Sequence, residues 1–295
     1  LILDPPVEGQ GTWLNTSIYV FTPSSLQGGT TYKARIKAGL QDTTGGVLAE
    51  DYEWSFSTQP PRVVWVSPGE DARLVGVDTS VQVTFNMPVD CASAGHAFSL
   101  RTGLREVPGV FACSDTTLIF TPTAKLDFDT TFRAQVKRGV SGAGGGEGMR
   151  EDYEWHFTTV PLPRLLGTRP YNGQKDARPY TDFQILFNAP IDPATVMPNL
   201  EMKPPISPSQ VYTYFTWDNV FVLGFGAQPS TDYEVHIGPN IADPYGNTTG
   251  QEITVRFRTA PLDPGVWLLM AGQVGTLDAG QPAQIVAAYV NVTQL

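Results

Sequence analysis

Two cysteines are the side chains of this sequence most able to form a covalent bond. Cys91 and Cys113 are its only cysteines. A catalytic thiolate needs an activating base, and no histidine lies near either cysteine within a matching nucleophile motif. We therefore predict a disulfide in an exported protein, with two inert thiols as the alternative. Closing a loop of about 20 residues would stabilise the fold by roughly 3 kcal/mol in the chain-entropy model.

The three histidines do not form a metal-binding pattern. His156 and His236 alternate with apolar residues about eighty positions apart, so we expect them to face solvent on different domains. His96 has no motif around it that would supply further ligands. Since a zinc ion needs several ligands converging at about 2 Å, we predict no metal site and no cofactor.

Four aspartates lie at expected turns. Asp90 and Asp192 follow "FNMPV" and "FNAPI", whereas Asp42 and Asp243 begin the Gly-containing stretches "DTTGG" and "DPYGN". Carboxylates in such places accept backbone hydrogen bonds in Asx turns, and calcium, which requires six to eight oxygen ligands, is the alternative. The second copy of the turn reads "SGAGGG", so this turn does not require an acid.

Aromatic residues outside the core pattern could stack on a sugar. They are densest at Tyr212, Tyr214 and Trp217, and Trp13 and Tyr171 lie elsewhere in the chain. Aromatic side chains also cover the edges of β-sandwiches and the joints between domains. Carbohydrate binding through Tyr212, Tyr214 and Trp217 is thus one hypothesis beside a purely structural role.

Composition excludes several classes of function. A formal net charge of -10 argues against nucleic acid, whose phosphates require clustered Lys and Arg. No run of about 18 apolar residues could span a membrane. The sequence has no G-x-S-x-G, P-loop, H-E-x-x-H or paired-carboxylate motif, so we predict a protein that is not an enzyme. The abrupt start at "LILDPP" and end at "VNVTQL" lead us to expect a segment of a longer, secreted, periplasmic or cell-surface protein.

One strand sequence occurs three times along the chain, and it determines how the domains that carry the candidate residues are organised. "EDYEWSFSTQPP" (Glu50–Pro61) returns as "EDYEWHFTTVPLP" (Glu151–Pro163) and as "EITVRFRTAP". Apolar and polar residues alternate in each copy, as in a half-buried antiparallel strand. One face of the strand carries Tyr52, Trp54, Phe56 and Thr58 in the first copy, Tyr153, Trp155, Phe157 and Thr159 in the second, and Ile253, Val255, Phe257 and Thr259 in the third.

Other segments recur in the same register, with a period near one hundred residues. Proline and glycine interrupt short apolar runs along the whole chain, and no window has the 3.6-residue period of an amphipathic helix. The predicted fold class is all-β, with tandem immunoglobulin-like sandwiches in an elongated arrangement. The expected domains are a partial sandwich at 1–59, complete sandwiches at 60–160 and 161–260, and a further β domain or tail from 261 to 295.

The linkers and the first repeat raise two structural expectations. "TQPPR", "TVPLPR" and "TAPLDP" are short and Pro-rich, which favours stiff joints. Residues 1–58 correspond to the second repeat only from about Phe98 onward, so two opening strands are missing. This half-sandwich should expose its core and unpaired edges. Tyr32 and Tyr233 occupy the position of a tyrosine corner, where the second repeat has Phe132.

The repeated pattern "V.V.FN.P.D…L.FTP…T.Y…DY.W.F.T" resembles the bacterial Ig-like repeats of S-layer proteins and other large secreted proteins. The ending "IVAAYVNVTQL" is similar to the first macroglobulin-type strands of bacterial alpha-2-macroglobulins, which trap proteases, often with a thioester. No C-x-E-Q thioester sequence occurs. The resemblance implies a spacer or docking region of such an endopeptidase inhibitor, with proteases as partners of the whole protein.

Two other classes of function remain open from the sequence. One is an adhesin or S-layer module that binds a glycan or a protein partner. The other is a β-sandwich accessory domain of a secreted hydrolase, which would require a catalytic domain elsewhere in the longer chain.

Overall fold

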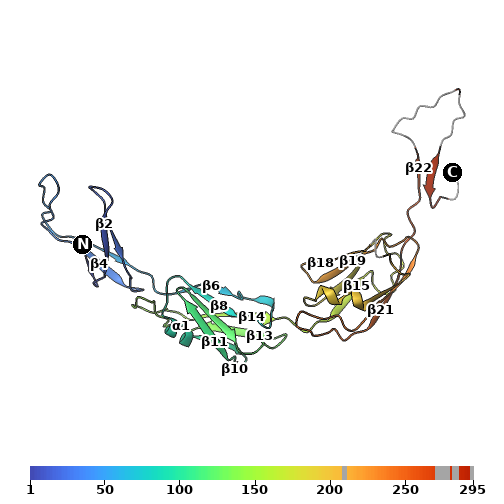
Figure 1. The fold of residues 1–295 in the computed structure, drawn as a ribbon, viewed down its shortest axis with the longest axis horizontal. Helices are drawn as coiled ribbons and strands as arrows, with labels where there is room; N and C mark the ends of the chain where they lie inside the picture. Colours follow the sequence, from blue (N-terminus) through green and yellow to red (C-terminus); the bar gives the residue numbers. More distant parts are fainter. Residues whose placement is uncertain (208–210, 270–279, 281–285, 293–295) are drawn as a thin grey trace. The chain divides into compact units, whose positions relative to one another are not determined.

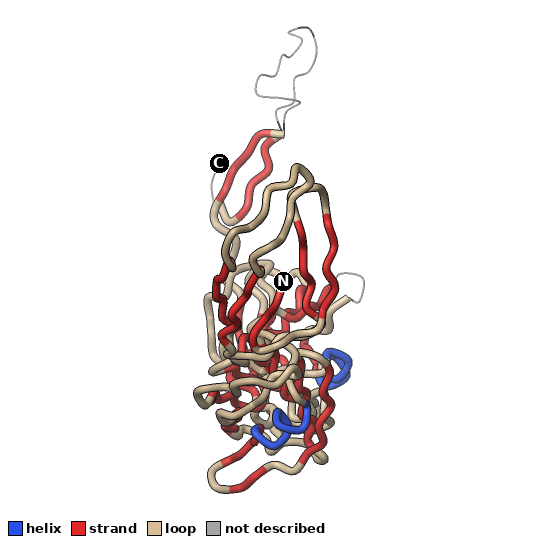
Figure 2. Tube along the Cα trace, turned by 90° about the vertical axis from the view of Figure 1, so that its left-hand side faces the viewer, coloured by secondary structure: helices blue, strands red, loops and turns tan. Residues whose placement is uncertain are grey.

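The computed structural model describes residues 1–207, 211–269, 280 and 286–292. Within these residues the helical segments are α1 (Cys91–Ala97) and the 3-10 turns η1 (Pro193–Thr195) and η2 (Met197–Asn199), shown in blue in Figure 2. All other regular elements are strands, and they form separate sheets (Figure 1). The predicted all-β class with tandem sandwiches is confirmed. The chain divides into two compact units, Leu1–Val160 and Pro161–Leu295.

The second repeat is a complete sandwich of two sheets. The five-stranded sheet has the order β10 (Arg105–Glu106), β9 (Phe98–Thr102), β13 (Thr131–Val136), β14 (Tyr153–Thr159) and β7 (Ala72–Val75). The four-stranded sheet has the order β11 (Gly109–Ser114), β12 (Thr117–Pro122), β8 (Val81–Phe85) and β6 (Val63–Ser67). Strand β7 runs parallel to β14, and every other strand pair in this repeat is antiparallel.

The alternation in the repeated strand places its aromatic face in the core. On β14, Trp155 and Phe157 are buried, whereas the side chain of His156 points to solvent and is 44% exposed. Trp155 lies opposite Ala134 of β13 in the register. A large residue thus faces a small one across the strands, which fills the interior without overpacking.

The opening strand of the second repeat is divided between the two sheets. Strand β6 pairs with β8, and after Ser67 and Pro68 the chain crosses to the other sheet, where β7 pairs with β14. The indole Nε1 of Trp155 donates a hydrogen bond to the carbonyl oxygen of Pro68 at 2.9 Å. This bond fixes the crossing point and satisfies the one polar atom of the buried indole.

The third repeat follows the same plan with two strands fewer among its described residues. One sheet has the order β15 (Leu165–Arg169), β16 (Phe183–Phe187), β19 (Val220–Gly224) and β18 (Tyr212–Phe215), and the other has β17 (Leu200–Lys203), β20 (Asp232–Ile237) and β21 (Ile253–Arg258). A parallel bridge between Ala177 and Thr259 stands where β7 pairs in the second repeat. Val235 faces Val255 where the other repeats have an Ala–Trp pair, so two side chains of middle size replace a small one and a large one.

The first repeat is an open half of this plan. It contains β1 (Ile2–Asp4), β4 (Thr31–Ile36) and β5 (Tyr52–Ser57) in one sheet, and β2 (Gly9–Trp13) with β3 (Tyr19–Pro23) in the other. Residues 1–59, all of them described, contain no counterpart of β6, β7 or β8. The sequence predicts that two opening strands are missing from the first repeat. The complete second repeat has three strands in that place, because its opening strand is split between two sheets.

Two short hydrogen-bonding motifs explain further repeated residues. The hydroxyl oxygens of Tyr32 and Tyr233 accept from the backbone N–H groups of Gln27 and Gln228, each at 2.8 Å, which confirms the predicted tyrosine corners. The threonine that ends each repeated strand bonds through its Oγ1 to an upstream carbonyl, as Thr159 does to Asp127 at 2.6 Å. The residues shared by the copies thus either pack in the core or form hydrogen bonds at the ends of the strands.

The asparagine of the "FN" motif holds the start of each complete sandwich. Asn86 Oδ1 accepts from the Arg62 N–H at 2.8 Å, and its Nδ2 donates to Pro60 O at 3.3 Å. In the third repeat Asn188 makes the same two bonds with the backbone of Arg164 and Leu162, at 2.7 and 3.0 Å. Part of each of the first two Pro-rich linkers is therefore hydrogen-bonded to the repeat that follows it.

The C-terminal segment forms a hairpin of β22 (Gly265–Leu268) and β23 (Ala287–Val290). Residues 270–279, 281–285 and 293–295 of the predicted macroglobulin-like segment lie outside the described residues. Among the described helices, none has the length and apolar character that crossing a membrane requires. The elongated arrangement stays a prediction from the linkers.

Candidate functional site

A disulfide joins Cys91 and Cys113, whose Cα atoms are 5.7 Å apart. Cys91 is the first residue of α1, and Cys113 lies on the edge strand β11, so the bond attaches the short helix to the sheet. An isolated helix of seven residues would be marginal in water. In the third repeat Phe215 occupies the place of Cys113 and packs against the hydrophobic core, which replaces the covalent link by burial.

The four aspartates singled out in the sequence bind backbone groups. Asp90 caps α1 by accepting from the Ser93 N–H at 2.8 Å, and Asp192 caps η1 through Ala194 at 3.0 Å. Asp42 accepts from the N–H of Thr44 at 2.8 Å, and hydrogen bonds from this residue are the main reason that the pKa of Asp42 is lowered. Asp243 accepts from the backbone N–H of Asn247 at 2.8 Å. These contacts are the turn chemistry that the sequence predicts.

Metal-ligating side chains do not gather in the part of the chain that the structure describes. No group of three or more His, Cys, Asp or Glu residues there could hold a metal ion. His156 Nδ1 lies 3.8 Å from Glu70 Oε1, and His236 Nε2 lies 3.4 Å from Glu252 Oε1. The two pairs are on the solvent faces of separate repeats. His96 is in the last turn of α1. The structure brings none of the three histidines together.

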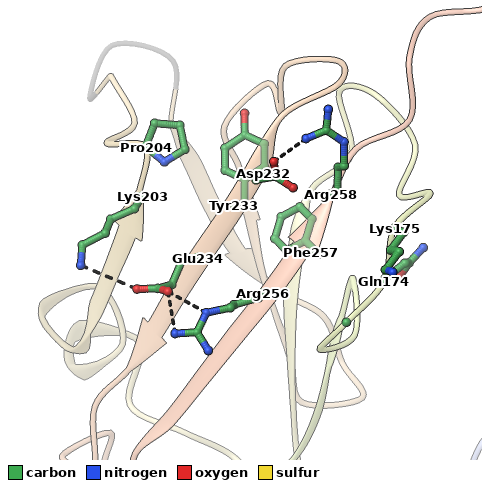
Figure 3. Close-up of a pocket in the computed structure, with 11 residues that line it drawn as sticks. Gln174, Lys175, Lys203, Pro204, Asp232, Tyr233, Glu234, Arg256, Phe257 and Arg258 are labelled. Atoms are coloured by element: carbon green, nitrogen blue, oxygen red, sulfur yellow. Dashed lines mark hydrogen bonds and ion pairs between the residues drawn. The ribbon is translucent and has the colours of Figure 1, made fainter.

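An open hollow of about 530 Å³ lies over the outer face of β17, β20 and β21 in the third repeat (Figure 3). The carboxylate of Glu234 lies between two positively charged side chains. Its oxygens are 3.7 Å from Lys203 Nζ and 2.8 Å from both Nε and Nη2 of Arg256. The hydrogen bond from Arg256, followed by its charge, holds the pKa of Glu234 below its ordinary value. Asp232 pairs with Arg258 in the same way. An ionised, paired carboxylate is a poor proton donor, so this cluster is a ladder of cross-strand ion pairs.

The three candidate ligand aromatics lie together at one edge of the third repeat. Tyr212 and Tyr214 are on the edge strand β18, with their ring centroids 6.3 Å apart and the planes inclined by 7°. They are 55% and 49% exposed, and Trp217, in the turn that leads to β19, is 96% exposed. Trp13 and Tyr171 are also exposed but lie on other elements. The Tyr212 hydroxyl bonds to Asp182, and among the described residues no buried polar side-chain atom is left without a hydrogen-bond partner at the cluster.

The largest change between the repeats is the open face of the first one. Trp54 and Phe56 are 39% and 36% exposed, whereas Trp155 and Phe157, their counterparts in the second repeat, are 0% and 1% exposed. A groove of about 750 Å³ runs between the sheets, lined by apolar side chains that include Leu3, Phe21, Ala34, Trp54 and Phe56. Exposed apolar surface of this kind beside free strand edges marks a place for another strand or partner.

The repeats match one family of domains along almost their entire length. Three consecutive matches to the bacterial Ig-like domain cover residues 3–58, 57–159 and 161–259. The chain belongs to the bacterial Ig-like domain family. The incomplete first sandwich is thus itself an Ig-like domain, matched from β1 to the end of β5.

A much longer relative matches almost the whole chain. The chain is 23% identical to an alpha-2-macroglobulin homolog of Nostoc sp. (strain PCC 7120 / SAG 25.82 / UTEX 2576), in a match that covers 98% of this chain and 17% of the relative. The chain therefore spans about a sixth of the relative's length. The expected resemblance to Ig-like repeats and to an alpha-2-macroglobulin is confirmed.

Two solved structures are also similar. One is native alpha-2-macroglobulin from Escherichia coli spanning domains MG0-NIE-MG1, with 15% identity over 71% of this chain and 74% of that chain, and a TM-score of 0.29. The other is the N-terminal part of the bacterial S-layer protein SbsC, with 18% identity over 68% of this chain and 44% of that chain, and a TM-score of 0.28. The assignment of the Ig-like repeats rests on the family match.

Some structural roles of Ig-like residues could not be predicted from the sequence. The glycines of "SGAGGG" contact the first repeat, where Gly28 and Gly146 form a parallel bridge. A Cβ on Gly146 would lie 2.3 Å from the Gly28 carbonyl oxygen. This explains why the loop has a glycine at 146, where the third repeat has Asn247. The only sequence signal was the divergence of the loop from the other copies.

Proposed function

We propose that these residues form a non-catalytic spacer and interaction region of a secreted, periplasmic or cell-surface bacterial protein of the alpha-2-macroglobulin type. The observation that carries the proposal is the match to an alpha-2-macroglobulin homolog along 98% of the chain, together with three consecutive Ig-like repeats. The disulfide between Cys91 and Cys113 supports an exported location, because such bonds persist in oxidising compartments.

The groups capable of chemistry in the described residues support a structural role. The aspartates cap turns and the carboxylates of the third repeat are paired with bases. Inhibition of an endopeptidase would belong to other parts of the longer protein, and this region would position that apparatus. The closed second and third repeats act as spacers, and the open first repeat is the interaction site.

The occupant of the open first repeat is a β-strand segment of the same class as β6 to β8. In the second repeat these strands cover Trp155 and Phe157, and their apolar residues Val81, Val83 and Phe85 are all buried. The free edge of β5 corresponds to the edge of β14 that pairs with β7. Adding strands there satisfies backbone groups and buries the groove at once.

A protease inhibition assay on the chain alone tests the spacer role. The chain in molar excess should leave cleavage of a large protein substrate by trypsin-like and elastase-like proteases unchanged, with no covalent adduct on a denaturing gel. Reduced cleavage of the large substrate, with cleavage of a small peptide preserved, would show that this region itself contains the inhibitory apparatus and would overturn the proposal.

A further inference from the structure

The outer face of the sheet β15-β16-β19-β18 carries aromatic residues that the Ig-like fold does not require. Tyr212 pairs with Gly224, and Tyr214 pairs with Val222, in the register of β18 and β19. The same positions of the sister repeats, read from the pairs of β2 with β3 and of β11 with β12, are occupied by Gln10, Thr12, Val110 and Ala112. Those repeats form the same strand without an aromatic pair.

The ring of Tyr212 lies flat on the sheet. A Cβ built on Gly224 would stand 2.0 Å from Cζ, 2.1 Å from Cε1 and 2.6 Å from Cε2 of Tyr212. Similar distances to three adjacent ring atoms place this point over the face of the ring, not beyond its edge. Glycine at 224 thus makes room for the ring. The Tyr212 hydroxyl donates a hydrogen bond to Asp182 Oδ1 at 2.9 Å, which fixes the ring in this position.

Tyr214 extends the flat surface along the strand. Its ring plane lies within 7° of that of Tyr212, and the centroids are 6.3 Å apart. Two residues of a strand rise by about 6.6 Å, so the rings lie side by side with the spacing of the backbone. Val222 beneath them is 1% exposed, whereas both rings are about half exposed. Each ring therefore has one face on the protein and one face free.

We propose that Tyr212 and Tyr214 form a stacking platform for an extended, β-linked pyranose glycan. The apolar C–H face of a pyranose ring packs on a flat aromatic ring, and its equatorial hydroxyls need polar groups at the rim. Asp182 lies at the rim, and Gln184 is in the cross-strand row of Tyr214 and Val222. Trp217, in the turn that follows β18, is a further exposed aromatic residue near the end of this strand.

The charges beside the platform favour a glycan over a nucleic acid, which also stacks on aromatic rings. The cross-strand row of Tyr214 continues through Gln184 to Arg169, while Asp182 is bonded to Tyr212 itself. A phosphate backbone requires a positively charged track, whereas the Arg169 cation in this row is accompanied by the Asp182 carboxylate at Tyr212. The platform takes an uncharged sugar chain.

Binding of cellohexaose and chitohexaose, measured by isothermal titration calorimetry and by chemical-shift changes of the full chain, tests the proposal. Tyr212→Ala and Tyr214→Ala should each weaken binding at least about tenfold. Gly224→Ala should do the same while keeping both tyrosines, because its methyl group displaces the Tyr212 ring. The fold accepts a side chain there, since the second repeat has Thr121 at this position. Tyr171→Ala, at an exposed tyrosine elsewhere in the third repeat, should bind like the unaltered chain.

Three results would overturn the platform. The first is no binding of either oligosaccharide by the unaltered chain at millimolar concentration. The second is binding that all three platform variants retain. The third is a dimer in light scattering that Tyr212→Ala dissociates, since a second copy of the chain would then occupy the face. Circular dichroism of each variant confirms that a loss of binding is not a loss of folding.

Discussion

At the scale of single residues, two tryptophans in the same sequence context differ in burial. Trp155 is 0% exposed and Trp54 is 39% exposed, although they occupy the same place in their repeats. The alternation of "DYEWHF" predicted which side chains share a face of the strand. Whether that face is covered depends on strands far away in the chain, which the alternation does not contain.

Trp155→Ala should lower the free energy of unfolding of the second repeat by about 3–5 kcal/mol, because it opens a cavity and removes the hydrogen bond to Pro68. The matched control, Trp54→Ala, should cost less than half as much, since that indole is already partly in water. Urea denaturation followed by circular dichroism measures both. Equal losses in the two variants would contradict the burial that the structure shows.

Tyr212 provides a prediction on pH. Its hydroxyl donates to Asp182, and this bond is the main cause that raises the pKa of Tyr212 above the ordinary 10.0. The raised value means that the folded state favours the protonated phenol. The resulting stabilisation is present below the unfolded pKa and is lost as the pH rises through the folded one.

Ultraviolet absorbance of tyrosinate during an alkaline titration checks this point. Subtracting the curve of Tyr212→Phe from that of the unaltered chain should leave a transition above the ordinary range of tyrosine. Asp182→Asn should move that transition down, since an amide replaces the carboxylate that accepts the bond. An unchanged transition in Asp182→Asn would mean that Asp182 does not hold the ring.

At the scale of elements, the glycine-rich loop of the second repeat joins it to the first. The N–H of Gly28 donates to Gly145 O at 2.9 Å, and the N–H of Glu147 donates to Gly28 O at 2.8 Å. Gly146 has a φ of +91°, and its missing side chain allows this approach of two backbones.

Gly146→Ala should therefore open the joint, and hydrogen exchange at the amides of Gly28 and Glu147 should become at least about tenfold faster. Gly139→Ala is the control, because Gly139 has a φ of +98° but no atom within 4 Å of the place that a methyl group would take. It adds comparable backbone strain without a clash. Faster exchange at the joint in both variants would assign the effect to strain alone.

The open first repeat can be closed by design. Leu3 pairs with Ala34 as Leu100 pairs with Ala134, so a copy of residues 60–97 fused ahead of Leu1 supplies β6 to β8 and α1 in register. With Cys91→Ser in the copy to avoid a free thiol, Trp54 should become buried, and quenching of its fluorescence by acrylamide should fall. The Trp54→Phe variant identifies its signal among the other tryptophans.

The same fusion with Val81→Asp and Val83→Asp in the copied β8 is the negative control, because charged residues cannot enter the core. Trp54 should stay accessible in that protein. If the intact copy also leaves Trp54 accessible, the groove of the first repeat does not accept strands of this class, and its role as the interaction site is wrong.

At the scale of the whole molecule, the sequence predicted the all-β class, the tandem sandwiches and the tyrosine corners, because each is written in local alternation and repeats about every hundred residues. The sequence also singled out Tyr212 and Tyr214 as aromatic residues outside the core. It could not show that the Tyr212 ring lies on Gly224, because that contact joins two strands whose register appears only in the sheet. The role of Asn86 and Asn188 in holding the linkers was missed for the same reason, although the repeated "FN" was visible.

The most direct test of the central claim, two closed Ig-like repeats behind an open one, is hydrogen exchange measured strand by strand on the intact chain. We predict slow exchange in the sandwich strands β14 and β21 and clearly faster exchange in β5, because β5 has a free edge and an uncovered face. Protection of β5 equal to that of β14 would show that the first repeat is already closed. It would remove the basis for an interaction site there.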